Sequence, residues 1–374
     1  MERNGNTRNP FLLSGYVSPE YFCDREKETE RLISALRNGR NITLVSPRRM
    51  GKTGLIRHAF HAIGQQGHEH CYLIDLYQTD SLTSLVSSLA RVVLGTLDTK
   101  GERLMKTVGT FFKSLRPTFS IDTMTGRPEI GIDVQPNHAE QSLVEIFNYM
   151  EHSGKQCFVA FDEFQRVAEY DDSNIEALLR SHIQQLSNVH FVFSGSQRHV
   201  LENMFASAKR PFYQSTQIMN LDCVDAEAYY SFAAAKLEGH EQQISRDVFL
   251  YMYNRLHGHT WYIQAVLNRL FEKGISEISQ SDIDETLHDI TEENEATFQT
   301  MLRMITPAQR KLLRAVAKEV EVEEITGKTF LSAYHLGAAS TINAATRSLV
   351  DKELLLDDNG RYSVYDRFLA LYLE

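Results

Sequence analysis

The chain has 374 residues, 42% of them hydrophobic and 24% charged, which is the composition of a globular protein with room for two or three domains. Its formal net charge of −10 argues against a protein that binds nucleic acid through a generally cationic surface. No apolar run approaches the roughly 20 residues of a membrane span, and the polar start MERNGNTRNP lacks the hydrophobic segment of a signal peptide, so we expect a cytoplasmic protein without membrane contact.

The first predicted elements are a helix, a short strand and a second helix. Residues 24–36 have an acidic first turn followed by apolar residues on one face, the pattern of a surface helix. The run NITLVS is a short buried strand, and GKTGLIRHAFHAI is a helix that follows it closely. The N–H groups at the start of this helix then point at whatever lies above the strand end. This order is the context that a phosphate-binding loop requires.

Further short apolar runs alternate with helical segments up to Leu221. They read CYLIDLY, QCFVAFDEF, VHFVFSGS and QIMNL. Buried strands that alternate with helices predict the α/β class, with a parallel sheet covered on both faces. Residues 116–136 depart from this rhythm, because polar and apolar residues alternate on either side of Thr125-Gly126. They predict a β-hairpin, which either decorates the surface or contacts a partner.

The rest of the chain, after Leu221, is predicted to be mainly helical. Residues 224–304 follow a helical pattern, and the stretch between Gly274 and Leu302 holds eight Asp or Glu and no Lys or Arg, which is typical of a solvated acidic face or a linker. Thr306 is an N-cap followed by Pro307 in the first turn of a helix. The order of helix, turn, helix and two short strands after it predicts a winged helix-turn-helix.

The loop SPRRMGKT carries the residue types that bind nucleotide phosphates. Gly51 lets the backbone approach a phosphate, Lys52 supplies a charge to the β- and γ-phosphates, and the Thr53 hydroxyl ligates Mg²⁺. Ser46 stands where the loop pattern asks for glycine, which matters only if that position needs a positive φ. Since a small serine before Pro47 can close the turn differently, we expect a competent site. The residues predicted to contact ATP or ADP here are Ser46, Arg49, Met50, Gly51, Lys52, Thr53 and Gly54.

Two acids stand at the end of the apolar run CFVAFDEFQ. The run delivers them to the carboxyl end of a buried strand, which is where open parallel sheets bind ligands. Asp162 is expected to hold the magnesium together with Thr53, and Glu163 to orient or deprotonate the attacking water. The alternative is a helix N-cap without chemistry. Beside a phosphate loop, the pair predicts hydrolysis rather than binding alone.

Two further residues are candidates for contact with the reacting phosphate. The strand VHFVFSGSQ ends in polar residues beside the acid-bearing strand. Ser196 is placed there to hydrogen-bond the attacking water or the γ-phosphate, and capping of the strand end is its alternative role. Arg210, just before the last core strand, is a candidate arginine finger for the γ-phosphate of its own or a neighbouring subunit. A surface salt bridge is the alternative for Arg210.

Several segments together resemble AAA+-type P-loop ATPases of the archaeal-ATPase clade, which are related to the signal-transduction ATPases with numerous domains (STAND). The segments are NPFLLSGYV, FCDREKETERL, SPRRMGKTGLI, FVAFDEFQ, FVFSGSQ, HGHTWYIQ and LVDKELLLDDNGRYSVYDRFLALYL. They span nearly the whole chain. The resemblance implies a P-loop ATPase core over 1–222, a helical lid over 223–304 and a winged helix over 305–374.

The resemblance also implies nucleotide contacts beyond the phosphate loop. Phe22, Asp24 and Arg25 would lie beside the adenine, and the lid would close over the nucleotide through a Gly-x-Pro turn. In this sequence that turn reads Gly258-His259-Thr260, so the proline is missing and His259 takes the contacting position. Without the resemblance, His259 is a helix-boundary residue.

The combined prediction is an ATP-hydrolysing switch whose nucleotide state changes the placement of the winged helix and the binding of a protein partner or a second copy. The alternative is a DNA-associated transcriptional regulator in which ATP is mainly structural. Residues 306–374 hold nine Lys or Arg against ten Asp or Glu, and the expected recognition helix STINAATRSLVDK carries only Arg347 and Lys352. We therefore expect residues 300–374 to bind DNA weakly, because affinity for DNA comes largely from neutralised phosphates.

The sequence contains no grouping of residues that is typical of metal hydrolases, thiol enzymes or nucleases. The cysteines are widely separated and follow no metal-ligand spacing: Cys23, Cys71, Cys157 and Cys223. Buried free thiols in a reducing compartment are the expectation for such a pattern.

Overall fold

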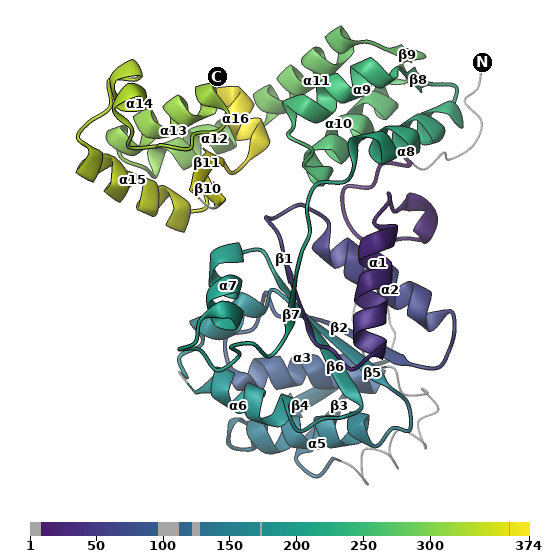
Figure 1. The fold of residues 1–374 in the computed structure, drawn as a ribbon. Coiled ribbons are helices and arrows are strands. Elements are labelled where there is room, and N and C mark those ends of the chain that lie inside the picture. Colours follow the sequence, from purple (N-terminus) through teal and green to yellow (C-terminus); the bar gives the residue numbers. More distant parts are fainter. Residues whose placement is uncertain (1–8, 96–111, 122–127, 173, 359) are drawn as a thin grey trace. The chain divides into compact units, whose positions relative to one another are not determined.

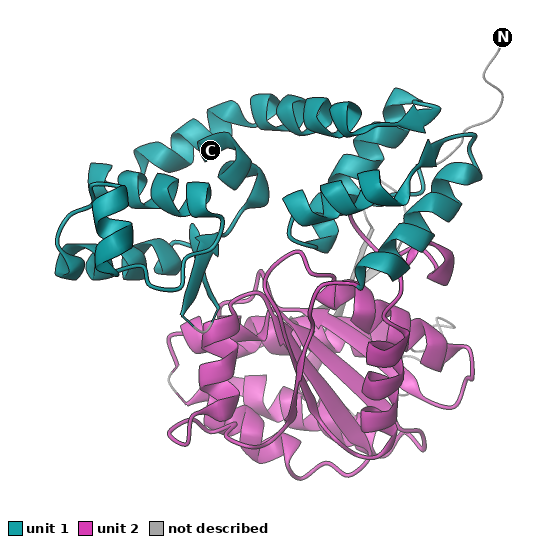
Figure 2. Cartoon of the chain, turned by 45° about the horizontal axis from the view of Figure 1, so that its top comes forward, with its two compact units in different colours: residues 1–13, 225–374 teal, residues 14–224 magenta. Residues whose placement is uncertain are grey.

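The protein divides into two compact units. The first, here called the sheet unit, comprises residues 14–224, and the second, the helical unit, comprises residues 225–374 with the N-terminal segment up to residue 13 (Figure 2). The computed structural model describes residues 9–95, 112–121, 128–172, 174–358 and 360–374. Each unit is built around elements of its own.

The sheet unit contains a five-stranded sheet in the order β2-β5-β6-β1-β7 (Figure 1). The strands are β1 (Ile42–Val45), β2 (His70–Asp75), β5 (Cys157–Asp162), β6 (Val189–Gly195) and β7 (Gln217–Asn220). Every neighbouring pair is parallel. Each strand coincides with one of the short apolar runs, and the predicted α/β fold with a parallel sheet is confirmed.

Helices cover both faces of this sheet. They are α1 (Glu26–Arg37), α2 (Lys52–Gly64), α3 (Leu82–Gly95), α5 (Ala139–Glu151), α6 (Ile175–Ile183) and α7 (Arg198–Ala206), with the 3₁₀ helices η1 (Pro19–Tyr21), η2 (Pro136–His138) and η3 (Phe164–Glu169). Phe158 and Ala160 of β5 join a core with α1 and α2. Val159 and Phe161 join a second core with α3, α5, α6 and α7. Since alternate side chains point to opposite faces and both faces are buried, the strand has a continuous apolar sequence.

A β-hairpin is inserted between two of the α/β units. Strand β3 (Leu115–Ile121) pairs antiparallel with β4 (Pro128–Val134) in a register that runs from Leu115 opposite Val134 to Ile121 opposite Pro128. The hairpin forms a sheet of its own, and β4 packs against α3. The turn predicted at Thr125-Gly126 lies outside the described residues.

The first part of the helical unit is helical apart from one short strand pair. Its elements are α8 (Ala226–Glu238), α9 (Arg246–Arg255), α10 (Thr260–Lys273), α11 (Gln280–Glu293) and α12 (Glu295–Arg303), with β8 (Gln243–Ile244) parallel to β9 (Glu277–Ile278). The acidic stretch forms α11 and α12, so its interpretation as a linker is wrong. Part of its charge is paired, because Lys273 at the end of α10 donates to Asp289 of α11 (2.9 Å).

The second part of the helical unit has the element order predicted for a winged helix. Its elements are α13 (Pro307–Glu319), α14 (Lys328–Ala333), α15 (Ala339–Asp351), β10 (Leu355–Asp358), β11 (Arg361–Val364) and α16 (Arg367–Leu373). Thr306 caps α13 in a reciprocal capping box with Gln309. Strands β10 and β11 pair antiparallel as the wing. The C-terminal α16 packs against α11 and α13, which joins the winged helix to the first part of the unit.

The N-terminal segment packs on α10, far from it in sequence. Asn9 Nδ2 donates to the carbonyl of Asn268 (2.9 Å), and Asn268 Nδ2 donates to the carbonyl of Phe11 (2.7 Å). Trp261 Nε1 donates to the carbonyl of Leu13 (3.0 Å). These bonds and the full burial of Phe11 explain why the segment belongs to the helical unit although it precedes the sheet unit in the sequence.

The sequence predicted that the cysteines are buried free thiols, and the structure shows how far each of them is buried. None of the four cysteines forms a disulfide bond. Cys23 and Cys157 are buried, Cys71 is half-buried and Cys223 is exposed. The expectation of burial is therefore wrong for Cys223. None of the helices in the described ranges has the length and apolar character needed to cross a membrane.

Candidate active site

The loop between β1 and α2 shows why Ser46 is tolerated. Strand β1 ends at Val45 and α2 begins at Lys52. Arg49 and Gly51 have positive φ angles of 66° and 91°, whereas Ser46 does not adopt a positive φ. The freedom of glycine is therefore used at Gly51, and a serine at position 46 carries no backbone strain. Ser46 is 2% exposed, and its Oγ donates to the carbonyl of Pro47 (3.0 Å).

Lys52 lies inside this loop. Its side chain is 7% exposed, and Nζ donates to the carbonyls of Ser46 and Pro47, both at 2.8 Å. Burial lowers the pKa of Lys52 to about 8, and the nearby charges of Glu163 and Asp162 partly counteract this shift. The two acids of the next motif are therefore close enough to act on the ammonium group electrostatically.

Arg25 supports the loop from the segment before α1. It is 3% exposed, and its Nη2 donates to the carbonyl of Met50 (3.3 Å) while Nη1 pairs with Glu28 (2.9 Å). Asp24 and Arg25 both have positive φ angles, 51° and 71°, and α1 starts directly after them. The structure thus gives Arg25 a contact with the loop backbone, while its role beside an adenine stays a prediction, as does that of Asp24.

Phe22 belongs to an aromatic cluster with Tyr16 and with His58 of α2. Its ring stacks on that of His58, with 4.4 Å between centroids and 17° between planes. Tyr16 meets both rings edge-on, and its hydroxyl lies 3.0 Å from Nδ1 of His58. A Cβ added at Gly54 would lie 3.2 Å from Cε2 of Phe22. The absence of a side chain at Gly54 therefore lets Phe22 pack closely against the helix that begins with Lys52.

Asp162 at the end of β5 meets the start of α2. Its Oδ2 accepts from Oγ1 of Thr53 (2.5 Å), although the two residues lie 109 positions apart. Its Oδ1 accepts from Oγ of Ser194 (2.6 Å). The structure brings the two predicted metal ligands together. Ser194 was not predicted to contact Asp162, and the signal for it is a hydroxyl inside the otherwise apolar run VHFVFSG.

Glu163 follows Asp162 in a left-handed backbone conformation with φ of 56°. Its Oε2 accepts from Oγ of Ser196 (2.8 Å), which lies just beyond the end of the neighbouring strand β6. Gln165 also donates to this oxygen. Glu163 was predicted to act on the attacking water, and Ser196 on that water or the γ-phosphate; the structure brings these two residues into direct contact. Gln165 was missed, because a glutamine after an acidic pair carries no recognised spacing.

Arg210 forms an ion pair within the sheet unit. It donates to Glu176 at the start of α6. Burial raises the pKa of Glu176, and the charge of Arg210 counteracts this shift. The salt bridge that was the alternative for Arg210 is present in the structure. Its role as an arginine finger stays a prediction and requires this ion pair to open.

His259 lies in the helical unit, before the first residue of α10. It is 8% exposed, and its Nε2 is 3.5 Å from Nη2 of Arg367 on α16. Burial and the charge of Arg367 lower the pKa of His259 to about 3, so the ring is neutral at physiological pH. The structure assigns His259 a contact with the C-terminal helix, and its contact with a nucleotide stays a prediction.

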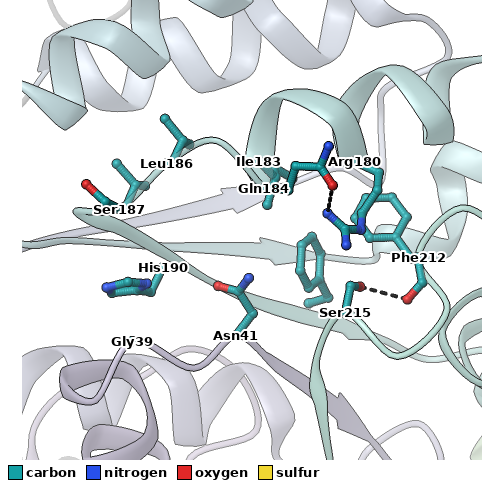
Figure 3. Close-up of a pocket in the computed structure, with 12 residues that line it drawn as sticks. Gly39, Asn41, Arg180, Ile183, Gln184, Leu186, Ser187, His190, Phe212 and Ser215 are labelled. Carbon is teal, nitrogen blue, oxygen red and sulfur yellow. Dashed lines mark hydrogen bonds between the residues drawn. The ribbon is translucent and has the colours of Figure 1, made fainter.

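A cavity of about 380 Å³ lies at the amino ends of the strands, opposite the carboxyl ends that carry the predicted site (Figure 3). It is bordered by Gly39 and Asn41 before β1, by His190 at the start of β6 and by Ser215 before β7. These positions are the amino ends of the strands. None of the residues predicted to bind nucleotide lines this cavity, so it is separate from the site at the carboxyl ends.

Comparisons with known proteins identify the family of this chain and its fold. Residues 22–266 match the ATPase domain family predominantly from Archaea, and residues 296–374 match a family described as a probable winged helix domain. The Walker-type ATPase of Pyrococcus abyssi is similar over 97% of this chain and 99% of its own, with a TM-score of 0.66 and 17% identity. No curated protein matches the chain.

Two proteins of Aeropyrum pernix are also similar in structure. The ORC2 protein, solved in ADPNP-ADP complexes, has a TM-score of 0.58 and 14% identity over 98% of this chain and 95% of its own. The ORC1 protein, solved in complex with DNA, has a TM-score of 0.54 and 13% identity over 98% of this chain and 96% of its own. At these identities the likeness shows a shared fold.

We predict that nucleotide affinity falls as the pH rises through about 8, because the pKa of Lys52 lies there. A bound polyphosphate favours the charged ammonium and so raises this pKa. Between the two pKa values the complex holds more protons than the free protein, so binding takes up a proton and weakens by as much as about tenfold per pH unit. Calorimetry in buffers of different ionisation enthalpy measures both effects.

The matched control for this pH dependence is Lys52→Arg. A guanidinium stays protonated throughout this range, so whatever affinity the variant retains should not change between pH 7 and pH 9. A wild-type affinity that is constant over the same range would contradict the assignment of Lys52 as the titrating phosphate ligand.

Proposed function

We propose that this chain, which belongs to the ATPase domain family predominantly from Archaea, is an ATP-hydrolysing switch. The family match and the similar fold of a Walker-type ATPase confirm the prediction of an AAA+-type P-loop ATPase. Binding of ATP and ADP with Mg²⁺ is part of the proposal. The proposal adds that nucleotide state controls the arrangement of an ATPase core over 1–222, a lid over 223–304 and a winged helix over 305–374. A protein partner or a second copy would read this arrangement, as in the STAND ATPases that the sequence resembles.

The observation that carries the proposed ATP hydrolysis is the contact of Thr53 with Asp162. It joins the first turn of α2 to the end of β5 through two oxygen atoms 2.5 Å apart. A hydroxyl and a carboxylate are hard oxygen ligands of the kind that Mg²⁺ prefers, and Mg²⁺ is usually held by one or two protein groups together with substrate phosphates. The residues therefore fit the metal, which would neutralise charge on the phosphates when bound.

The remaining roles follow from what surrounds this contact. Lys52 is buried in the phosphate loop and carries the charge for the phosphates. Glu163 follows Asp162 and is the general base or water-orienting residue, with Ser196 bonded to it. Further nucleotide contacts are proposed for the backbone of residues 49–51, for Gly54 and for the segment from Phe22 to Arg25.

The switch is tested by hydrogen exchange of the full chain with ADP and with a non-hydrolysable ATP analogue. If nucleotide state controls the helical unit, amide protection in α10 and α16 should differ between the two nucleotides, because local stability responds to domain contacts. Lys52→Ala, which should not bind either nucleotide, is the control and should show no difference. Equal exchange of both helices in the wild type with the two nucleotides would reject the switch while leaving the ATPase intact.

The second candidate function is a DNA-associated regulator, and two observations favour its inclusion. The chain has a C-terminal winged helix, and a protein of similar fold, ORC1 of Aeropyrum pernix, is solved in complex with DNA. Against it stands the charge of the domain. Arg361 at the wing is paired with Glu321 and Glu323 at 3.4 and 3.3 Å.

We predict that the full chain binds duplex DNA no more tightly than the roughly 10⁻⁴ to 10⁻⁶ M of nonspecific association at physiological salt. Arg347 on the exposed side of α15 has too few cationic neighbours on that helix to neutralise several phosphates. Fluorescence anisotropy of a labelled duplex, with ADP or with an ATP analogue present, measures the affinity, and phosphate release with and without DNA shows any stimulation. Nanomolar, sequence-dependent binding that Arg347→Ala abolishes would favour the regulator instead.

A further inference from the structure

Gln165 lies against the carboxylate of Glu163. It is the second residue of η3 and is 3% exposed. Its Nε2 donates to Oε2 of Glu163 and lies 3.4 Å from Oγ of Ser196. The same Oε2 accepts from Ser196 through Oγ (2.8 Å) and through the backbone N–H (3.3 Å). Donors from two residues thus converge on one carboxylate oxygen, and among the described residues no hydrogen bond reaches Oε1.

The amide of Gln165 is not oriented to satisfy its own polar atoms. Its Oε1 is buried and finds no hydrogen-bond partner among the described residues, which is unfavourable for a buried acceptor. Turning the amide over would place this oxygen against the carboxylate of Glu163, and two acceptors repel each other. The orientation of Gln165 is therefore determined by Glu163.

Gly195 at the end of β6 makes room for this amide. A Cβ added at Gly195 would collide with Oε1 of Gln165 and would lie 2.9 Å from Cδ1 of Leu201. Gly195 does not have a positive φ, so its backbone conformation is open to other residues and only the space is restricted. The residue directly before Ser196 is thus a glycine because Gln165 occupies the volume of a side chain.

We propose that Gln165 is a positioning residue for ATP hydrolysis, which holds Glu163 through Oε2 so that Oε1 is directed at the attacking water. The inference rests on the proposed role of Glu163 as water-orienting base. Glu163 needs such support, because its left-handed backbone conformation (φ 56°) is uncommon for a residue with a side chain. Ser196 and Gln165 supply it from the two elements that flank the carboxylate.

Gln165→Leu tests the inference, since leucine keeps much of the buried volume and removes both polar atoms. We expect kcat to fall about tenfold or more, because small displacements of a reacting group are costly in rate. KM and the affinity for ATP should stay within about twofold, because the change acts on the transition state and not on ground-state binding. An unchanged or increased kcat would overturn the proposal.

Gln165→Glu supplies a readout that a purely structural role would not change. At high pH its carboxylate would repel that of Glu163, whereas a protonated carboxyl can donate the hydrogen bond that the amide donates in the wild type. We expect the ratio of its kcat to that of the wild type to increase as the pH falls. A ratio independent of pH would contradict a hydrogen bond as the acting interaction.

Gly195→Ala tests the same contact from the neighbouring strand β6, which ends at Gly195. The added methyl should displace the amide of Gln165, which is the flexible end of a side chain, and lower kcat as Gln165→Leu does. The double variant Gly195→Ala/Gln165→Ala should be no slower than Gln165→Ala alone, since the most severe clash is gone and the remaining neighbour, Cδ1 of Leu201, is the flexible end of a side chain. Additive losses in the double variant would show that Gly195 acts independently of Gln165 and would overturn the proposed contact.

A last comparison separates this inference from the function on which it rests. In the Glu163→Gln background, Gln165→Leu should lower kcat by less than about twofold, because Gln165 acts through Glu163. If Glu163→Gln itself keeps the wild-type kcat, the proposed function of Glu163 fails. If Glu163→Gln slows turnover but Gln165→Leu does not, the function stands and only the inference about Gln165 fails.

Discussion

Lys52→Ala should abolish nucleotide binding. The ammonium of Lys52 is the buried cation of the loop between β1 and α2, bonded to the carbonyls of Ser46 and Pro47, and charge-assisted bonds to phosphate oxygens are among the strongest available to a protein. Alanine leaves the N–H groups at the start of α2 in place but supplies no charge. Calorimetric titration with ATP and with ADP should show no binding in the range where the wild type saturates.

The control for this variant is Lys27→Ala. Lys27 is exposed on α1, and alanine is a good helix former, so the substitution should change neither affinity nor folding. A thermal melt of Lys52→Ala checks that the variant is folded. Its buried charge is desolvated, as the lowered pKa of Lys52 shows, so its removal relieves a cost of folding. Unchanged nucleotide affinity in a folded Lys52→Ala variant would remove the loop from the site.

Glu163→Gln should bind ATP as tightly as the wild type and hydrolyse it about 10²-fold more slowly or worse, the loss expected when a general base is removed. Glutamine has nearly the same shape and keeps an oxygen that can accept from Ser196, so the surroundings of the site are preserved. It lacks the negative charge that draws a proton from water. Steady-state phosphate release gives kcat, and calorimetry gives the affinity.

Glu169→Gln is the matched control for this second variant. Glu169 lies on the same short helix, η3, and is exposed, where it pairs with Arg166. Exposed ion pairs of this kind contribute about 0–1 kcal/mol, so turnover should stay close to that of the wild type. If Glu163→Gln retained wild-type turnover, the base would have to be sought elsewhere in the site.

The predictable part of the fold and site came from local patterns. The runs around β1, β5 and β6 identified buried strands, because a strand covered on both faces has no polar face to show. Lys52 follows one strand and Asp162 ends another. Their positions therefore indicated that both lie at the carboxyl ends of the strands of one sheet. Chemistry at that edge follows from topology, since parallel strands all end there.

Contacts between distant segments were beyond the reach of these patterns. The bond of Arg25 to the carbonyl of Met50 and the pairing of Arg210 with Glu176 depend on how segments 25 and 34 residues apart are packed. A charged residue has no periodicity that reveals its partner. For Arg210 the motif suggested a phosphate contact, whereas packing against α6 supplied a carboxylate.

The sequence by itself determined that this protein is an α/β ATPase with a phosphate loop, an acidic pair and a winged helix, because each of these is a local pattern of residue types along the chain. The tertiary structure alone decided that Gln165 and Ser196 hold Glu163 and that Gly195 leaves room for the Gln165 side chain. These contacts arise because β6 lies between β5 and β1, which places residues about 30 positions apart against each other. Strand order is set by the packing of the whole sheet, and no short segment contains it.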